Sequence, residues 1–318
     1  MFEHHRTRLN GLDYHFVTCG IGPAVLFCHG FPDLWRTWRH QMEAVAEAGF
    51  MAIAPDLRGF GESEGPADPH AYTVVDVVGD LVALLDHMDI PSCTIIGHDW
   101  GSNISWAAPL IRPDRFTAVM SLSAPYTPRA PLSVPRALKA SGQDTAYMLY
   151  FLEQGPADAE LDADPKTFLR NFFYANSGSL PSGEKPNMVT SPAGTIIDSL
   201  QSPPGELPWF DEEELEIYTR EFARRGFTTA LASYRSLDRG WQLMAAWADR
   251  VLDVPAGYIY GDRDISTTFP GRAEAITKFT ELAPKGRPPV PLAGVGHFIQ
   301  LERPDEVSAG IIDFLRSL

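Results

Sequence analysis

Cysteine is scarce in this sequence, and the cysteines that occur do not suit a disulfide framework. Cys19, Cys28 and Cys93 are odd in number among 318 residues, and each lies within or beside an apolar run that is typical of a strand. Disulfide frameworks belong to small secreted domains, so buried free thiols in a reducing compartment explain this usage better. We therefore expect a cytoplasmic location.

Long apolar runs are absent as well. No stretch approaches the ~20 consecutive apolar residues that a membrane-spanning helix needs. The polar segment 1–10 lacks the apolar centre of a secretory signal. We therefore expect no membrane span. The hydrophobic content of 44% is nevertheless that of a globular protein with a substantial core.

Positive charge is in short supply: 26 Lys and Arg against 41 Asp and Glu give a formal net charge of -15. Proteins that hold phosphate backbones do so with clustered Lys and Arg, so we expect no nucleic-acid partner. His4 and His5 belong to no set of side chains at metal-ligand spacing, and no HExxH motif occurs. The sequence therefore predicts no metal site.

The stretch DLRGFGESEG resembles a dinucleotide-binding fingerprint. Gly59, Gly61 and Gly65 follow a predicted strand. However, Pro66 and Pro69 occupy the place where the phosphate-binding helix should begin. We interpret the stretch as a loop and expect no cofactor.

Short apolar runs alternate with helical patterns over most of the chain. Strands are predicted at 24–28, 51–57, 92–96, 116–122, 257–260 and 290–293, helices at 33–48, 73–88, 102–111 and 306–318, and a hairpin over 6–20. Strands that are apolar throughout and alternate with helices are typical of a parallel sheet covered on both faces. The predicted fold class is therefore α/β, with a mostly parallel central sheet.

The pattern changes after Pro125. Residues 128–239 are mostly helical, apart from a Pro-, Gly- and Ser-rich excursion at 177–208. A helical insertion therefore interrupts one α/β domain. We predict a first part of the core at 1–127, a helical cap at 128–244 and a second part of the core at 245–318.

One helix start within the insertion is well marked. Asp211 is the expected N-cap, Glu214 follows three residues later as in a capping box, and Phe210 and Leu215 form a hydrophobic staple.

The stretch IIGHDWGS centres on Asp99. The apolar run before it stops at Gly97, and Gly101 lies symmetrically beyond the aspartate. This is the small-x-nucleophile-x-small pattern of a strained turn between a strand and a helix. Serine usually occupies the centre of such a turn. The aspartate therefore either disables a hydrolase or marks one with a different chemistry.

Candidate catalytic side chains directly follow several predicted strands. Asp99 follows one strand, Asp262 and Asp264 follow another, and His297 follows the last. In open α/β sheets, ligands bind beyond the carboxyl ends of the strands. A nucleophile, an acid and a histidine in this chain order form a triad, for which either later aspartate could supply the acid.

An aspartate nucleophile suits attack at a saturated carbon. A serine attacking there would leave an ether that the enzyme could not cleave, whereas a carboxylate leaves an ester that water activated by His297 can hydrolyse. The backbone N–H groups of Phe31 and Trp100 would hold the oxyanion formed during that hydrolysis. Asp99 therefore predicts displacement at an sp3 carbon through an alkyl-enzyme ester.

The motifs HGFP, GHDWGS, GDRD and GVGHF together resemble those of the epoxide hydrolases, and the whole chain resembles the α/β-hydrolase fold. The resemblance implies hydrolysis of an epoxide to a vicinal diol. It favours Asp264, the last residue of GDRD, over Asp262 as the triad acid. It also implies a cis bond before Pro32, which would aim the Phe31 N–H into the pocket.

The same resemblance assigns two tyrosines of the cap. The segments AYMLYF and ASYRS are similar to the family's two cap segments and place the proton-donor roles on Tyr147 and Tyr234. A neutral phenol can donate to the alkoxide that forms as an epoxide opens. Tyr150, one helical turn from Tyr147, is the rival for the first role. The candidate pocket residues are Phe31, Trp100, Met148 and Tyr150.

Two alternatives stay open. Haloalkane dehalogenases share the Asp nucleophile and often the Trp after it, but many carry Asn where this chain has Phe31. Fluoroacetate dehalogenases have Arg where it has Trp100. A hydrolase fold kept only to bind a small molecule would not need the intact Asp264 and His297. The expected partners are a small-molecule epoxide and water, and a homodimer is compatible with the sequence.

Overall fold

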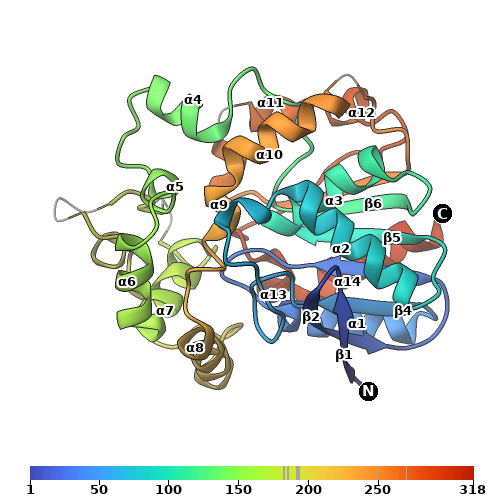
Figure 1. Ribbon diagram of the computed structural model, residues 1–318, viewed down its shortest axis with the longest axis horizontal. Helices are drawn as coiled ribbons and strands as arrows, with labels where there is room; N and C mark the ends of the chain where they lie inside the picture. The colour runs from blue at the N-terminus through green and yellow to red at the C-terminus, as the bar shows by residue number, and fades with distance from the viewer. Residues whose placement is uncertain (182, 185, 191–193, 249, 270) are drawn as a thin grey trace.

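An eight-stranded sheet is the centre of the computed structural model, which describes residues 1–181, 183–184, 186–190, 194–248, 250–269 and 271–318 (Figure 1). The strands are β1 (Glu3–Leu9), β2 (Leu12–Cys19), β3 (Ala24–Cys28), β4 (Met51–Pro55), β5 (Cys93–His98), β6 (Phe116–Leu122), β7 (Ala256–Gly261) and β8 (Val290–Leu292). Their spatial order is β1-β2-β4-β3-β5-β6-β7-β8. The β1–β2 and β2–β4 pairs are antiparallel and all other pairs are parallel, so the prediction of a mostly parallel sheet is confirmed.

The strands form where the apolar runs predict them. β3 and β6 have the predicted bounds, and every residue of β5 is buried, as a strand covered on both faces requires. The strand predicted at 51–57 ends at Pro55 instead. The next residue, Asp56, accepts hydrogen bonds from the backbone N–H groups of Trp35 (3.0 Å) and Glu62 (3.1 Å), which draw the chain out of the sheet. The glycine-rich stretch that follows runs as turns.

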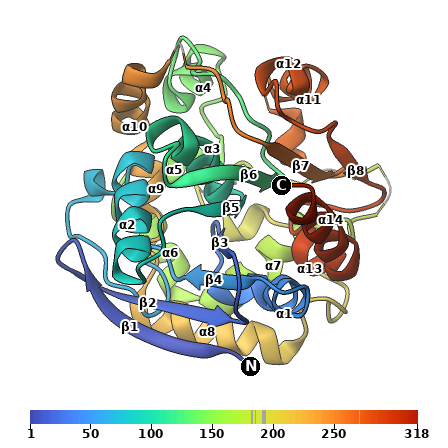
Figure 2. The same ribbon diagram turned by 90° about the vertical axis from the view of Figure 1, so that its right-hand side faces the viewer.

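Helices cover both faces of the sheet. The helices of the core are α1 (Arg39–Glu47), α2 (Val74–His87), α3 (Trp100–Ile111), α11 (Arg272–Thr277), α12 (Phe279–Leu282), α13 (Ile299–Glu302) and α14 (Pro304–Arg316). α1 and α14 pack together on one face, and α2 and α3 on the other (Figure 2). Each face has its own apolar core, one including Leu81 and Ile104, the other Met42 and Phe314.

The predicted start of the helix at 33–48 is wrong. A 3-10 turn at Trp35–Trp38 precedes α1, which begins at Arg39. Asp33 stays outside the helix because its buried carboxylate accepts a hydrogen bond from the Tyr218 hydroxyl (2.7 Å), 185 residues further along the chain. α3 begins at Trp100, two residues earlier than predicted and directly after Asp99.

A group of helices lies beyond one end of the sheet (Figure 1). They are α4 (Val134–Ala140), α5 (Tyr147–Tyr150), α6 (Pro156–Ala163), α7 (Pro165–Ala175) and α8 (Glu212–Arg225), with α9 (Ala232–Arg235) and α10 (Leu237–Leu243) returning toward the core. The described part of the predicted excursion at 177–208 contains the 3-10 turn Ile197–Ser199, while 182, 185 and 191–193 lie outside the described residues. The domain boundaries at 127 and 244 stay a prediction.

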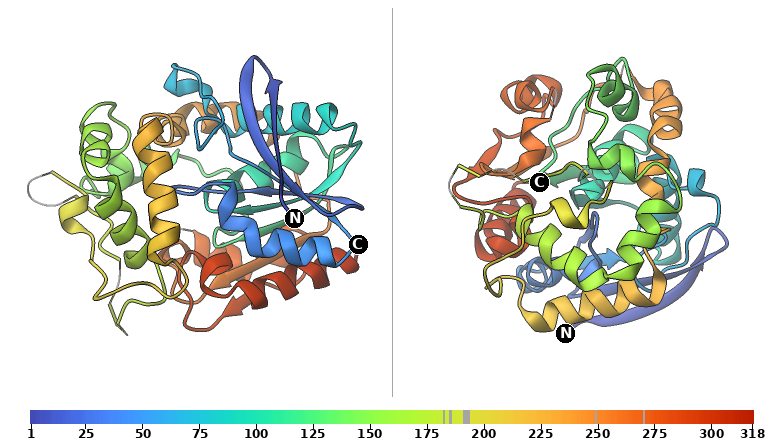
Figure 3. Two further views of the ribbon diagram at one scale, coloured as in Figure 1. Left: turned by 90° about the horizontal axis from the view of Figure 1, so that it is seen from below. Right: turned by 90° about the vertical axis from the view of Figure 1, so that its left-hand side faces the viewer.

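α8 packs against α7, along the side of the cap that is nearest to the N-terminal strands (Figure 3). Its N-cap is the predicted one, since the Asp211 side chain accepts from the Glu214 N–H (2.9 Å), and Phe210 and Leu215 are both buried. The prediction that the Glu214 side chain completes a capping box is wrong. The Glu214 carboxylate does not return to the N-cap but accepts bonds of 2.6 to 3.1 Å from the Arg36 guanidinium, and so ties the cap to the core.

All three cysteines are buried free thiols, as expected. Within the described ranges, no helix combines the length and the apolar character needed to cross a membrane. The same residues include no group of three His, Cys, Asp or Glu side chains arranged to hold a metal ion. The cytoplasmic location and the homodimer stay predictions.

Candidate active site

The turn between β5 and α3 presents Asp99. Its φ of 55° lies in a region that non-glycine residues rarely adopt. A Cβ atom on Gly97 would collide with the Gly101 carbonyl, and one on Gly101 would collide with the Cys28 carbonyl. The predicted elbow is therefore formed, and its two glycines are needed because backbone segments touch there. The Asp99 side chain keeps 25% of its surface accessible, enough to meet a reactant.

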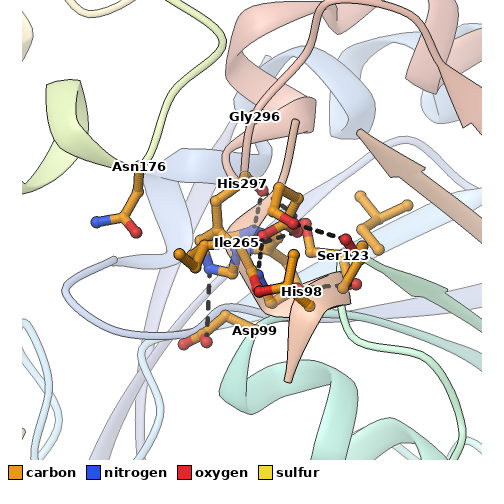
Figure 4. A network of polar contacts seen from close by, with 12 residues as sticks. His98, Asp99, Ser123, Asn176, Ile265, Gly296 and His297 are labelled. Atoms are coloured by element: carbon orange, nitrogen blue, oxygen red, sulfur yellow. Dashed lines mark hydrogen bonds and ion pairs between the residues drawn. The ribbon is translucent and has the colours of Figure 1, made fainter. Parts of the chain in front are cut away.

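The three triad candidates meet at the carboxyl end of the sheet. His297 Nε2 lies 3.5 Å from Asp99 Oδ2 (Figure 4), and His297 Nδ1 lies 3.1 and 3.2 Å from the two carboxylate oxygens of Asp264. Asp264 is 1% exposed and also accepts a hydrogen bond from the Ser266 N–H (2.7 Å). The rival Asp262 is exposed and accepts from the Gly294 N–H instead. The geometry therefore favours Asp264 as the partner of the histidine.

Two carboxylates set the charge of His297. Burial lowers the pKa of its imidazole, but Asp264 and Asp99 outweigh this effect and raise the pKa of His297 to about 10. Burial acts to raise the pKa of both carboxyls, yet the charge and hydrogen bonds of His297 hold the pKa of Asp99 and of Asp264 below the usual range. At neutral pH the resting site therefore holds an imidazolium between two carboxylates.

The backbone of His297 is fixed from both sides. Its carbonyl accepts hydrogen bonds from His98 Nε2 (2.8 Å) and Ser123 Oγ (2.6 Å), both from the core (Figure 4). Its N–H donates to the carbonyl of Asn176 (2.7 Å), which follows α7 of the cap. Burial, assisted by the charge of His297, lowers the pKa of His98 to about 3, so His98 is a neutral donor. The sequence singles out neither Ser123 nor Asn176; the signal at Ser123 is its place directly after β6.

One predicted oxyanion donor binds the candidate nucleophile, Asp99. The Phe31 N–H donates to Asp99 Oδ1 (2.8 Å), and the peptide bond between Phe31 and Pro32 is cis, as the sequence resemblance implies. Trp100 is the first residue of α3, where an amide N–H has no carbonyl one turn earlier to bind. The role of Trp100 in an oxyanion hole stays a prediction.

The two cap tyrosines lie together beside the elbow. The ring of Tyr234 on α9 is 5.0 Å from that of Trp100 and 6.1 Å from that of Tyr147 on α5. Burial raises the pKa of both phenols, and the charge of Asp99 raises it further. Both side chains are therefore neutral hydrogen-bond donors within electrostatic reach of Asp99.

Tyr150 is bound elsewhere. Its hydroxyl donates to Glu160 Oε2 (2.8 Å), and the other carboxylate oxygen of Glu160 accepts from the N–H groups of Ile196 and Ile197. This contact disfavours Tyr150 as a rival to Tyr147. Met148 is half-buried against the main apolar core. The pocket roles of Met148 and Tyr150 stay predictions.

A shell of aromatic cap residues surrounds Phe31. Its ring contacts Tyr234 at a centroid distance of 5.5 Å, and Phe151, Phe168, Phe172 and Phe227 at 5.8 to 6.4 Å. The sequence did not single out these phenylalanines, because their spacing is that of ordinary core positions. They exclude water from one side of the site, and charge interactions gain strength in such surroundings.

The order of these parts along the sheet, with the candidate nucleophile after β5, the candidate acid after β7 and the histidine after β8, is that of an α/β hydrolase. The family model described as alpha/beta hydrolase fold matches residues 23–202.

Comparison with known proteins narrows this class. Epoxide hydrolase 2 of Siraitia grosvenorii is 37% identical, with 99% of this chain and 98% of the relative covered, and Epoxide hydrolase A of Mycobacterium tuberculosis is 38% identical, with 97% and 96% covered. The crystal structure of Epoxide Hydrolase A from Mycobacterium thermoresistibile has a TM-score of 0.92 at 38% identity, covering 99% and 98%. Potato epoxide hydrolase I has a TM-score of 0.90 at 35% identity, covering 100% of both chains. The chain therefore belongs to the epoxide hydrolases, α/β hydrolases that act on ether bonds.

Proposed function

We propose that the enzyme hydrolyses an epoxide to a vicinal diol through a covalent ester on Asp99. The observation that carries the proposal is that Asp99 contacts a histidine that can activate water and lies on an elbow flanked by two buried tyrosines. His297 Nε2 lies 3.5 Å from Asp99 Oδ2, and the ring of Tyr234 lies 5.0 Å from that of Trp100, the residue after Asp99, and 6.1 Å from that of Tyr147.

In the first step the carboxylate opens the ring. Asp99 Oδ1 is held by the Phe31 N–H, so Oδ2 is the oxygen that attacks the epoxide carbon from the side opposite the C–O bond. The new C–O bond forms an ester as the ring C–O bond breaks. The ring oxygen takes a proton from the phenol pair of Tyr147 and Tyr234 and becomes the first hydroxyl of the diol.

Esterification changes the charge on His297. It removes one of the two carboxylates that raise the histidine pKa, so the imidazolium gives up its proton more readily. The phenolate left by ring opening takes up that proton. The site then holds neutral tyrosines, a neutral His297 and the ester on Asp99.

In the second step His297 removes a proton from water, which attacks the carbonyl carbon of the ester. The Phe31 N–H and the Trp100 N–H hold the resulting oxyanion on Oδ1. The ester bond then breaks, its alkyl oxygen takes the remaining proton of the added hydroxyl and leaves as the second hydroxyl of the diol, and Asp264 stabilises the imidazolium that remains. Asp99 is regenerated, and the resting charges are restored.

A single turnover in water labelled with 18O tests this sequence of steps. With enzyme in excess over styrene oxide, the diol should carry no label, because its second oxygen comes from Asp99 Oδ2, and the label should enter the peptide that contains Asp99. Labelled diol and unlabelled peptide would show direct attack by water. Halide release from a bromoalkane, measured beside diol formation, separates the proposal from dehalogenation, and turnover of neither substrate would favour a binding protein.

Gly30 provides a structural test of the nucleophile's placement. A Cβ atom there would collide with the Asp99 carboxylate. We expect Gly30→Ala to lower kcat/KM for styrene oxide about a hundredfold, because a displacement of ~1 Å at a reacting group has such an effect.

The matched control is Gly79→Ala. Gly79 is exposed in α2, and an added Cβ would meet nothing within 4 Å. It should raise the free energy of unfolding by ~0.5–1 kcal/mol and leave kcat/KM unchanged. Chemical denaturation and steady-state kinetics of both variants give the comparison, and full activity in Gly30→Ala would contradict the placement.

A further inference from the structure

Glu302, the last residue of α13, joins two backbone segments at the active site. It is 8% exposed, and its Oε2 accepts hydrogen bonds from the Gly178 N–H (2.8 Å) and the Gly296 N–H (3.1 Å). Gly296 directly precedes His297 in the chain. Gly178 belongs to the segment that follows α7 of the cap. One carboxylate oxygen therefore bonds to both the cap and the loop that carries the histidine.

The two segments also touch each other directly. The His297 N–H donates to the Asn176 carbonyl (2.7 Å), and a Cβ atom on Gly296 would collide with the backbone of Ser177 and Gly178. A Cβ on Gly178 would collide with the Gly294 carbonyl. At this close approach, the direction of the backbone through Gly296 and His297 depends on what the N–H groups of these two residues bind.

We propose that Glu302 is a positioning residue for the hydrolytic half of the reaction, holding the Gly296 amide so that His297 Nε2 faces both the ester on Asp99 and the attacking water. This inference rests on the proposed function.

The chemistry of the buried carboxyl fits this role. Burial raises the pKa of Glu302 to about 7, although its bonds to the Gly296 and Gly178 amides oppose the shift. Oε1 has no hydrogen-bond partner among the described residues and can carry a proton while Oε2 continues to accept. Positioning therefore needs an acceptor at Oε2 but no negative charge.

The two half-reactions depend on Glu302 differently. Ring opening uses the Asp99 carboxylate, the Phe31 N–H and the cap tyrosines, which come from elements that do not bond to Glu302. Ester hydrolysis also needs His297, whose loop Glu302 holds. Loss of the Glu302 acceptor should therefore slow ester hydrolysis and spare ester formation.

Rapid quench of enzyme mixed with excess styrene oxide, followed by intact-mass analysis, measures both rates. We expect Glu302→Leu to slow ester hydrolysis about tenfold to a hundredfold and to change ester formation by less than about threefold, so that the esterified fraction rises at steady state. Glu302→Gln keeps an acceptor oxygen and should behave like the parent. The side chain of Glu302→Asp is one methylene shorter, so this variant should also slow ester hydrolysis more than ester formation. It replaces the leucine variant in the experiment if the leucine variant does not fold.

Glu214→Leu is the matched control. Glu214 is 7% exposed and also links cap to core, but through Arg36, away from His297. It should lower thermal stability and leave the ratio of the two rates unchanged. The proposal is overturned if Glu302→Leu slows both steps equally, if it lowers stability alone, or if Glu302→Gln matches the leucine variant. Failure of the proposed function looks different, because no ester would then form on the parent or on His297→Gln.

Discussion

Replacing His297 with glutamine is expected to stop turnover and to trap the enzyme as an ester on Asp99. Glutamine fills a similar space but cannot remove a proton from water, and loss of a general base costs about a hundredfold to ten-thousandfold in rate. Ring opening does not need that base, so ester should form faster than it decays. Intact-mass analysis after exposure to styrene oxide should show the protein heavier by one substrate molecule.

The control for this experiment is the nucleophile. Asp99→Ala, alone or combined with His297→Gln, should give neither diol nor adduct, because no other carboxylate occupies the elbow. An adduct that persists without Asp99 would identify a different nucleophile. Absence of any adduct on His297→Gln, when the parent turns over the same epoxide, would count against the covalent mechanism.

The double variant Tyr147→Phe, Tyr234→Phe should lose ring opening. The leaving oxygen would then develop its charge without a donor, and removal of one such donor typically costs about a hundredfold to a thousandfold. Because both phenols serve one oxygen, each single variant should lose less than the double, which should lose at least about a thousandfold in kcat/KM. Diol formation from styrene oxide gives the rates, and ester should not accumulate.

Tyr150→Phe is the matched control for the tyrosine pair. It removes a hydroxyl from the same helix as Tyr147, but that hydroxyl is bound to Glu160. We expect kcat/KM to stay close to the parental value. A loss equal to that of Tyr147→Phe would reverse the assignment, and a double variant of Tyr147 and Tyr234 with parental kinetics would exclude both phenols.

The core, and the placing of the triad candidates at one edge of the sheet, were predictable because their signals are local. The bounds of β3 and β6 follow from uninterrupted apolar runs. Asp99 comes directly after β5, and His297 lies in the loop that follows β8, so both lie at one edge of the sheet. The elbow is visible in sequence because Gly97 and Gly101 leave room for backbone contacts. The resemblance then separated Asp264 from Asp262, which the residues alone could not do.

What the sequence did not predict depends on partners far away in the chain. The helix at 33–48 starts late because Asp33 is bound to Tyr218, and the capping box at Glu214 is incomplete because the glutamate binds Arg36. Glu302 acts on backbone amides, which have no residue signature. No local pattern records contacts of this kind.

The peptide of His297 accepts from the core at its carbonyl and donates to the cap at its N–H. The backbone of His297, the proposed base, is thus aligned by two parts of the protein that meet at one residue, and loss of the cap contact would free His297 on that side. The cap's contribution is the main-chain oxygen of Asn176, which any residue at that position could supply. Replacement of the Asn176 side chain should therefore leave this main-chain acceptor, and with it the alignment of His297, in place.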